Sequence, residues 1–594
     1  LDLGTGATLT GASFAMAAAS TITGTAAVTN ATTITDTGSD GTIAVQAGAY
    51  TAVTVKAGIG AYTLGDADAN AIAVGIAATS STNITSTAAD NVITLSIAGT
   101  YTGTVVTANL ADDNILSLAS GANIADATID TDFDNLTIVS GGSVTMTSAQ
   151  NDSFDGTLSV GGATTITLSD QSAATGLAGV ENYVLANFTN DFTAHSSTTS
   201  ITGNISGDTI NMGTTMLAAV TIDGLAGSDV ITMTDAGSST SDLDNVTNVE
   251  TITLGAAVTS IVTVDALVAS GQTLTVNGTA VGANNFTFDG NAETNGKFVI
   301  TGSALAANNE LTGGAGDDVF NISSEFFDAN DSFDGTSGSD TVNFTGNTEV
   351  VNADFDSATF DAIDTVTFAN TNTAITWTIA DDEVDGAFSI TATGTSAAVQ
   401  IDGSLEASAL SISSGSGTDT LKGGASGDDL NGGAGTDNIT GNGGADTLTG
   451  GANTDTFVFG ATDSLIASMD VIMDFDTNSD IIDHVVALSI GGSADGTATA
   501  GSVNVNTNGL ATFHTDDDDS LAQMIAALAA NLQDANNDAA GEIAIFEFEE
   551  DTYAFITDGV GSSTTGDTLI HLDGANGTDF DTITVTGAND VTIG

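Results

Sequence analysis

Residues 415–459 read GSGTDTLKG, GASGDDLNG, GAGTDNITG, NGGADTLTG and GANTDTFVF, which are consecutive segments of nine residues. Each segment has an aspartate at its fifth position and an apolar residue two places later. These aspartates are Asp419, Asp428, Asp437, Asp446 and Asp455. The glycines permit tight turns because glycine adopts positive φ easily, and the residues around the apolar position can form a short strand. Two segments therefore predict one coil with two turns and two strands, repeated every eighteen residues.

Such a coil stacks residues that are eighteen positions apart. Asp419, Asp437 and Asp455 are then expected along one edge, and Asp428 and Asp446 along the other. Stacked carboxylates repel one another unless a cation lies between them. Carboxylate and carbonyl oxygens, without sulfur or imidazole, are the donors that Ca²⁺ prefers. The five aspartates are therefore predicted to bind several calcium ions.

This stretch resembles the RTX nonapeptide repeat, Gly-Gly-x-Gly-x-Asp-apolar, which forms a calcium-binding parallel β-roll. Isolated copies of the pattern occur upstream as GLAGSDVI at 224–231, GGAGDDVF at 313–320 and GTSGSDTV at 335–342. The resemblance implies calcium ligands at Asp229, Asp318 and Asp340. For a single copy, a glycine-rich aspartate turn without a metal remains the alternative, since such turns are common in β proteins.

The segment MDVIMDFDTNSDIID, residues 469–483, resembles the C-terminal cap of RTX proteins exported by type I secretion. Asp476 and Asp480 are candidate ligands for a further ion, with a solvated acidic turn as the equal alternative. One helix is expected over residues 521–532, where apolar residues recur on one face after a capping Asp519 or Ser520. Apolar and other residues alternate again in segments 542–549 and 553–556, as in strands. This C-terminal part is similar to the tails of type I secreted surface proteins, whose export signals are C-terminal and uncleaved.

The composition of the 594-residue chain limits its class and its partners. It has 76 acidic residues and three lysines as its basic residues, giving a net charge of −73, so electrostatics oppose binding to nucleic acid or anionic membranes. A hydrophobic content of 41% argues against disorder. The absence of proline suits long hydrogen-bonded ladders, and the absence of cysteine leaves bound calcium as the expected staple. No run of apolar residues is long enough to predict a membrane span.

The expected fold class is all-β, either a β-solenoid or repeated β-sheet modules, with a C-terminal calcium-binding parallel β-roll and one short helix. Segments such as 91–97 and 164–168 alternate threonine or serine with branched apolar residues, as strands do. A solenoid is favoured because typical hairpin turns are scarce. Segments 243–254 and 360–368 are interpreted as an internal repeat rather than a site. The predicted regions are 1–200 (β, assembly or anchoring), 201–410 (β with degenerate turns), 411–460 (β-roll) and 461–594 (cap and secretion region).

An enzyme is not expected. The four histidines are isolated, and the zinc-protease, serine-nucleophile and phosphate-loop motifs are missing. A β-helix that degrades polysaccharides is a remote alternative, since paired carboxylates can cleave glycosides. The preferred hypothesis is an extracellular protein of the bacterial cell surface that assembles with itself into an S-layer-like lattice or a filament. A calcium-dependent adhesin is the alternative, and cell-surface polysaccharide is a possible partner of either.

Overall fold

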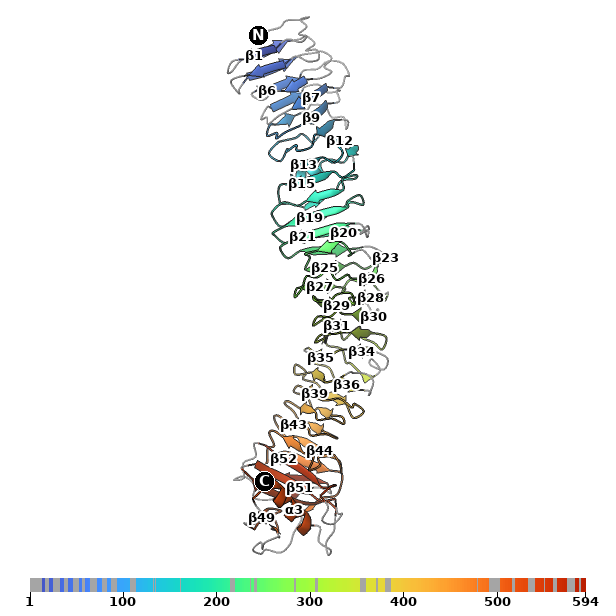
Figure 1. Ribbon diagram of the computed structural model, residues 1–594, viewed down its shortest axis with the longest axis vertical. Coiled ribbons are helices and arrows are strands. Elements are labelled where there is room, and N and C mark those ends of the chain that lie inside the picture. Colours follow the sequence, from blue (N-terminus) through green and yellow to red (C-terminus); the bar gives the residue numbers. More distant parts are fainter. Residues whose placement is uncertain are drawn as a thin grey trace. The chain divides into compact units, whose positions relative to one another are not determined.

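A computed structural model describes the strands within residues 13–86 and most of the chain from residue 93 to 593 (Figure 1). In that second range the description leaves out residues 107–113, 132, 134, 161, 172, 214–219, 235–236, 240–242, 283–284, 305–307, 353–358, 370–371, 380–385, 478, 491–502, 515–518, 533–539, 550, 559–563, 574–582 and 587–588. The chain divides into two compact units, Leu1–Asn277 (unit 1) and Gly278–Gly594 (unit 2). The boundary lies inside the region 201–410 of the sequence analysis.

Unit 1 is a parallel β-solenoid in which each strand pairs with strands of the neighbouring coils. Its ladders, in spatial order, are β1 (Ser13–Met16) and β3 (Thr33–Asp36); β10 (Val105–Val106), β8 (Asn83–Ser86), β6 (Ile59–Leu64), β4 (Gly41–Val45) and β2 (Thr21–Gly24); β14 (Leu158–Val160), β12 (Asn135–Ile138), β11 (Ile115–Leu118), β9 (Ile93–Ile97), β7 (Ile72–Ile76) and β5 (Val53–Val55); β13 (Ser143–Met146), β15 (Thr165–Leu168), β17 (Asn182–Val184), β19 (Ser200–Asn204), β21 (Thr221–Leu225) and β24 (Val246–Thr247); β16 (Ala173–Thr175), β18 (Asp191–Thr193), β20 (Thr209–Gly213), β22 (Val230–Met233), β25 (Thr251–Leu254) and β27 (Thr273–Asn277); and β23 (Gly237–Ser239) and β26 (Val258–Val262). A one-turn helix, α1 (Ser148–Asp152), lies between β13 and β14 in the chain.

Unit 2 is also a parallel β-solenoid, with three parallel ladders. They are β28 (Phe286–Asp289), β30 (Asn309–Thr312), β32 (Ser332–Asp334) and β34 (Thr359–Asp361); β29 (Lys297–Thr301), β31 (Val319–Ser323), β33 (Thr341–Thr345), β35 (Thr365–Phe368), β37 (Phe388–Thr391), β39 (Leu410–Ser413), β41 (Asp429–Asn431), β43 (Thr447–Thr449) and β45 (Asp470–Ile472); and β36 (Ile375–Thr378), β38 (Val399–Asp402), β40 (Thr420–Lys422), β42 (Asn438–Thr440), β44 (Thr456–Phe459) and β46 (Ile481–His484). The predicted all-β solenoid is thereby confirmed. The parallel ladders decide against the alternative of repeated β-sheet modules.

Alternation of small polar and branched apolar residues explains why these segments form strands. Side chains of a strand point alternately to opposite faces, so threonine and serine face outward while isoleucine, leucine and phenylalanine face inward. The parallel register stacks identical positions, as when Leu421 lies beside Ile439 and Ile439 beside Phe457. All three side chains are fully buried. In unit 2 the core also holds Trp377, which packs between Phe360 and Phe388.

The end of unit 2 departs from the parallel pattern. Its elements are β47 (Ser489–Ile490), β48 (Val503–Val505), β49 (Ala511–Phe513), α3 (Leu521–Leu532), β50 (Glu542–Phe548), β51 (Asp551–Ile556), β52 (Thr568–Leu572), β53 (Ile583–Val585) and β54 (Asp590–Ile593). β50, β51 and β52 form an antiparallel meander, β52 pairs with β45, and β54 pairs with β46. These pairings cover strands at the end of the solenoid that otherwise would expose unpaired backbone groups.

Helix α3 confirms the one helix expected from the sequence. The Ser520 hydroxyl accepts a hydrogen bond from the Gln523 backbone NH at 3.3 Å, so Ser520 is the cap. Ile525, Leu528 and Leu532 are buried against β48 and β50, as their spacing predicts. Within the described residues, no helix is long and apolar enough to cross a membrane.

Candidate metal centre

Four aspartates of unit 2 form a continuous column, column A, along the turns before β40, β42, β44 and β46. Column A comprises Asp419, Asp437, Asp455 and Asp480. The backbone NH of each donates to the Oδ1 of the next, at 2.8 Å from Asp419 to Asp437, 2.9 Å from Asp437 to Asp455 and 2.9 Å from Asp455 to Asp480. Each side chain is at most 2% exposed. The eighteen-residue stacking of Asp419, Asp437 and Asp455 is therefore confirmed.

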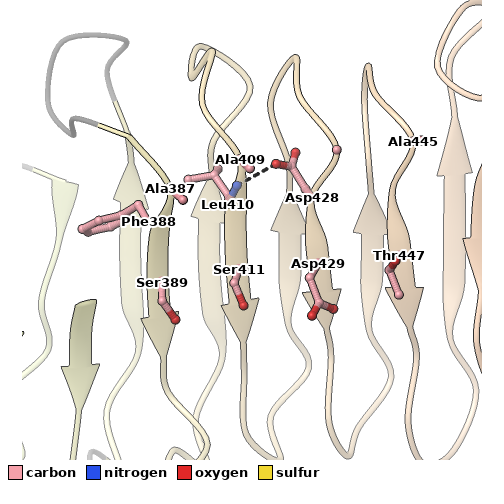
Figure 2. A pocket seen from close by; sticks show the side chains of 11 residues that line it. Ala387, Phe388, Ser389, Ala409, Leu410, Ser411, Asp428, Asp429, Ala445 and Thr447 are labelled. Carbon is pink, nitrogen blue, oxygen red and sulfur yellow. Dashed lines mark hydrogen bonds between the residues drawn. The ribbon is translucent and has the colours of Figure 1, made fainter. Parts of the chain in front are cut away.

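A second column, column B, comprises Asp428 and Asp446, which precede β41 and β43, and Asp470, the first residue of β45. Figure 2 shows its first link, a 2.8 Å hydrogen bond from the Leu410 backbone NH to Asp428 Oδ1. The backbone NH of Asp428 donates to Asp446 Oδ1 at 2.8 Å, and that of Asp446 to Asp470 Oδ1 at 3.0 Å. The neighbouring Asp429 is exposed on its strand, so only the residue in the turn enters the column.

The isolated upstream copies follow the same rule. In unit 2 the backbone NH of Asp318 donates to Asp340 Oδ1, and that of Asp340 donates to Asp364 Oδ2, both at 2.7 Å. We call this trio the upstream column. Asp318 and Asp340, predicted from single motif copies, are thus brought together, while Asp364 belongs to segment 360–368. That segment, interpreted as a repeat without a site, contributes to the column after all.

Unit 1 has its own column of three carboxylates, Asp208, Asp229 and Glu250. The backbone NH of Asp208 donates to Asp229 Oδ1, and that of Asp229 donates to Glu250 Oε2, both at 2.7 Å. Asp229 was predicted, whereas Asp208 and Glu250 were not. Glu250 lies in segment 243–254, the other copy of the internal repeat, so this copy also contributes to a column. Asp208 has a detectable signal, a glycine five positions earlier as in the repeats, at Gly203.

Several column carboxylates retain one oxygen without a hydrogen bond. The buried Oδ2 atoms of Asp229, Asp340, Asp437 and Asp455 have no hydrogen-bond partner among the described residues. A buried polar atom left without a partner costs free energy, on the order of 1–3 kcal/mol and more for a charged group. These oxygens therefore favour either a proton or a cation at the columns.

Glycines allow these carboxylates to lie directly against the backbone. A Cβ added to Gly432 would lie 2.6 Å from Asp437 Oδ2 and 2.9 Å from the carbonyl oxygen of Gly450. A Cβ added to Gly450 would likewise lie 2.6 Å from Asp455 Oδ2. At Gly432 the Asp437 carboxylate therefore lies beside a backbone carbonyl oxygen, and carboxylate with carbonyl oxygens is a donor set that fits Ca²⁺.

Burial and mutual repulsion raise the pKa of these carboxyl groups. Burial, reinforced by the charges of Asp419 and Asp455, raises the pKa of Asp437 to about 7 against the donated NH of Asp419. Burial with the nearby charge of Asp480 raises the pKa of Asp455 to about 6. Burial and the charge of Asp446 also raise the pKa of Asp470. At neutral pH the ionised columns are therefore strained by their own charge.

Basic side chains do not relieve this charge where they are described. Lys297 Nζ contacts Asp317 at 2.5 Å, and Lys422 Nζ contacts Asp402 at 2.8 Å. Both partners are partly exposed carboxylates outside the columns. A cation from solution would thus meet no competing ammonium group at columns A and B in the described residues.

The need for glycine beside a column carboxylate can be tested within one turn. Gly441→Ala is expected to destabilise the protein by about 1–3 kcal/mol and to weaken calcium binding, because the new methyl overlaps Asp446 Oδ2. Gly443→Ala is the matched control, since its methyl would meet nothing nearer than Ala425 at 3.9 Å. Urea unfolding of both variants with calcium present measures the difference. Equal stability of the two variants would contradict a requirement for glycine beside the Asp446 carboxylate.

Two other sequence expectations have definite places in the structure. Asp476 is exposed and stays outside column A, although its backbone NH donates to Asp480 Oδ2 at 2.8 Å. Trp377, the single tryptophan, is buried in the core, so it offers no platform for a bound sugar. A shallow groove of about 370 Å³ crosses β37, β39, β41 and β43 (Figure 2). Its lining includes alanine and serine side chains, the larger Phe388 and Leu410, and the carboxylates of Asp428 and Asp429.

Fold and site together define a parallel β-solenoid with internal columns of buried carboxylates. No protein-family model matches the chain, and no curated protein matches it either.

Proposed function

We propose that the chain is a structural extracellular protein of a bacterial cell surface, which assembles with itself after Ca²⁺ has ordered its coils. The columns of buried carboxylates carry this proposal. Ca²⁺ bound beside the unpartnered oxygens of Asp437 and Asp455 would neutralise the column and join successive turns. Metal binding of this kind contributes directly to folding, because the site does not exist in the unfolded chain. The role is structural rather than catalytic.

Export by a type I channel suits such a protein. A chain that needs calcium stays unfolded in a low-calcium cytosol and folds outside, where millimolar calcium occupies weak sites. Deletion of the residues after Leu488 is expected to abolish release into the medium, since the proposed signal is C-terminal. Immunoblots of medium and cells measure it, with the full chain as control. Continued release of the truncated chain would contradict this route.

Self-assembly is supported by exposed apolar side chains on unit 1. Phe188, Ile205 and Leu225 are 48%, 71% and 46% exposed. Phe188 and Ile205 lie in the bends after β17 and β19, and Leu225 is the last residue of β21, so the three residues belong to successive coils. We call these three residues the apolar ladder. Exposed apolar side chains on neighbouring coils offer a surface on which a second copy could pack. Two copies of a chain with net charge −73 approach only with counterions, and divalent ions can bridge facing carboxylates.

Calcium is expected to convert the purified protein from monomers into filaments or sheets. The triple variant Phe188→Ser, Ile205→Thr and Leu225→Thr should assemble at least about tenfold less readily, because the apolar contact is lost. Leu405→Thr, at a residue 60% exposed in unit 2, is the control. Negative-stain electron microscopy and analytical ultracentrifugation, each with and without Ca²⁺, measure the outcome. A protein that stays monomeric at high concentration with calcium would contradict assembly.

The groove across β37, β39, β41 and β43 favours an adhesin as the second candidate (Figure 2). Its hydroxyl and carboxylate groups, including Ser389, Ser411 and Asp429, could hydrogen-bond an extended ligand such as cell-surface polysaccharide. Binding of that polysaccharide to calcium-loaded monomers, lost in Asp429→Ala, would support the adhesin. Assembly without such binding would support the structural role.

A further inference from the structure

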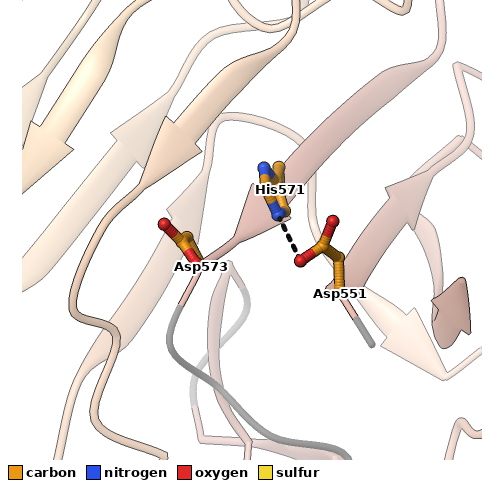
Figure 3. Close-up of side chains that lie close together, drawn as sticks. All are labelled: Asp551, His571 and Asp573. Atoms are coloured by element: carbon orange, nitrogen blue, oxygen red, sulfur yellow. Dashed lines mark ion pairs between the residues drawn. The ribbon is translucent and has the colours of Figure 1, made fainter. Parts of the chain in front are cut away.

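A cluster of one histidine and two aspartates lies on the meander at the end of unit 2, apart from the carboxylate columns. In the antiparallel pair β51–β52, Thr552 lies opposite Leu572 and Tyr553 opposite His571. Extending this register by one residue places Asp551 opposite Asp573. Because side chains alternate between the two faces of a sheet, Asp551, His571 and Asp573 share one face. One ligand atom from each lies within 4.8 Å of the others (Figure 3).

The imidazole of His571 is held in place but lacks a hydrogen bond. Its ring stacks on Tyr553 with centroids 5.0 Å apart and planes 17° from parallel. Its Nε2 is buried without a hydrogen-bond partner among the described residues and lies 3.6 Å from Asp551 Oδ1. Figure 3 shows this nitrogen directed at the Asp551 carboxylate. A buried nitrogen next to two carboxylates, with no hydrogen bond of its own, is suited to a shared metal ion.

We propose that Asp551, His571 and Asp573 bind one divalent transition-metal ion of the Zn²⁺ type, with a water molecule as the fourth ligand. Zn–N and Zn–O bonds of about 2.0–2.2 Å put tetrahedral ligands about 3.4 Å apart, close to the separation of His571 and Asp551. An imidazole ligand distinguishes this site from the oxygen-only columns, because nitrogen suits Zn²⁺ better than Ca²⁺. The ion would clamp β51 to β52, and β52 in turn pairs with β45 of the solenoid.

The test is a titration of the calcium-loaded full chain with Zn²⁺, followed by isothermal calorimetry. Millimolar calcium suppresses weak zinc binding to the many other carboxylates. One zinc ion per chain is expected, with affinity at least about tenfold lower in His571→Gln and in Asp551→Asn, since loss of even an outer-shell partner costs 10–100-fold. His195→Gln is the matched control, because His195 lies in unit 1 and contacts Ser197 instead. Co²⁺ titration adds a visible absorption band that reports tetrahedral nitrogen and oxygen ligation.

Asp551→Asn is the second variant because the Asp551 side chain is 44% exposed, so its substitution is not expected to unfold the meander. Circular dichroism of each variant establishes that the meander remains folded. Zinc binding that is unchanged in His571→Gln and Asp551→Asn would overturn the proposal. So would zinc binding that calcium displaces fully, since that behaviour belongs to carboxylate-only sites. Loss of the zinc site leaves calcium-dependent folding and assembly intact, so this proposal fails or stands independently of the proposed function.

Discussion

Chelation of calcium at pH 7.5 is expected to unfold the coils that carry columns A and B. Each column would then hold several ionised, buried carboxylates in line, with backbone NH groups as their main remaining partners. Circular dichroism in chelator should lose most of the β signal of these coils and their cooperative thermal transition. A few millimolar Ca²⁺ should restore both. An unchanged spectrum and transition in chelator would contradict calcium-dependent folding.

Low pH is expected to stabilise the calcium-free fold, because protons then neutralise the column carboxylates in place of calcium. The carboxyls of Asp437 and Asp340 have folded-state pKa values of about 7, against 3.8 when unperturbed. A raised pKa in the folded state means that protonation stabilises the fold, by up to about 1.4 kcal/mol for each pKa unit. Calcium-free protein should therefore be most stable near pH 4 and lose stability as the pH rises through about 7.

The calcium-loaded protein should show the opposite trend, because bound metal requires ionised carboxylates. The shift in melting temperature caused by calcium should be largest above pH 7.5 and vanish near pH 4. Thermal melts at four or five pH values, with calcium and with chelator, measure both curves. A calcium effect that persists undiminished at pH 4 would place the ions away from these columns.

Asp437→Asn is expected to change stability in opposite directions with and without calcium. The asparagine amide oxygen can still accept the hydrogen bond from the Asp419 backbone NH, so the column geometry is preserved. Without calcium, loss of the central charge relieves repulsion from Asp419 and Asp455 and should stabilise the fold by about 2–3 kcal/mol at pH 6, where the calcium-free protein still keeps part of its stability. With calcium, the lost ligand charge should lower both the melting temperature and the affinity for the metal.

Asp429→Asn is the matched control for this reversal. It removes the same charge from the same repeat region, but Asp429 is exposed on β41 outside the columns. Its effect should stay within about 0.5 kcal/mol in both conditions. Urea unfolding of the two variants, with calcium at pH 7.5 and with chelator at pH 6, gives the four comparisons. If Asp437→Asn destabilises the protein equally in both conditions, the side chain has only a structural role.

Sequence periodicity was sufficient to predict the solenoid and most of its central columns. A fixed nine-residue period places every aspartate in the same turn, and the parallel register then stacks residues eighteen positions apart. The sequence alone therefore assigns five aspartates to two edges of the coil, namely Asp419, Asp428, Asp437, Asp446 and Asp455. The spacing of apolar residues likewise located α3, because one helical face must pack on the core.

Tertiary structure alone revealed how the columns end and where they recur. Asp446 donates to Asp470 across 24 residues, and Asp455 to Asp480 across 25, because longer turns interrupt the nine-residue period. Asp470, Asp364 and Glu250 have no glycine five positions earlier, so no local pattern marks them. Strand pairing, rather than sequence spacing, brings their carboxylates to the donating NH groups.

The sequence likewise contains no pattern that marks the cluster of Asp551, His571 and Asp573. Its members come from two strands separated by a loop, and the antiparallel register decides which residues face each other. A sequence pattern determines structure where neighbouring residues make the contact or where a period repeats it. Contacts between strands joined by irregular loops depend on how the chain closes, which only the folded protein determines.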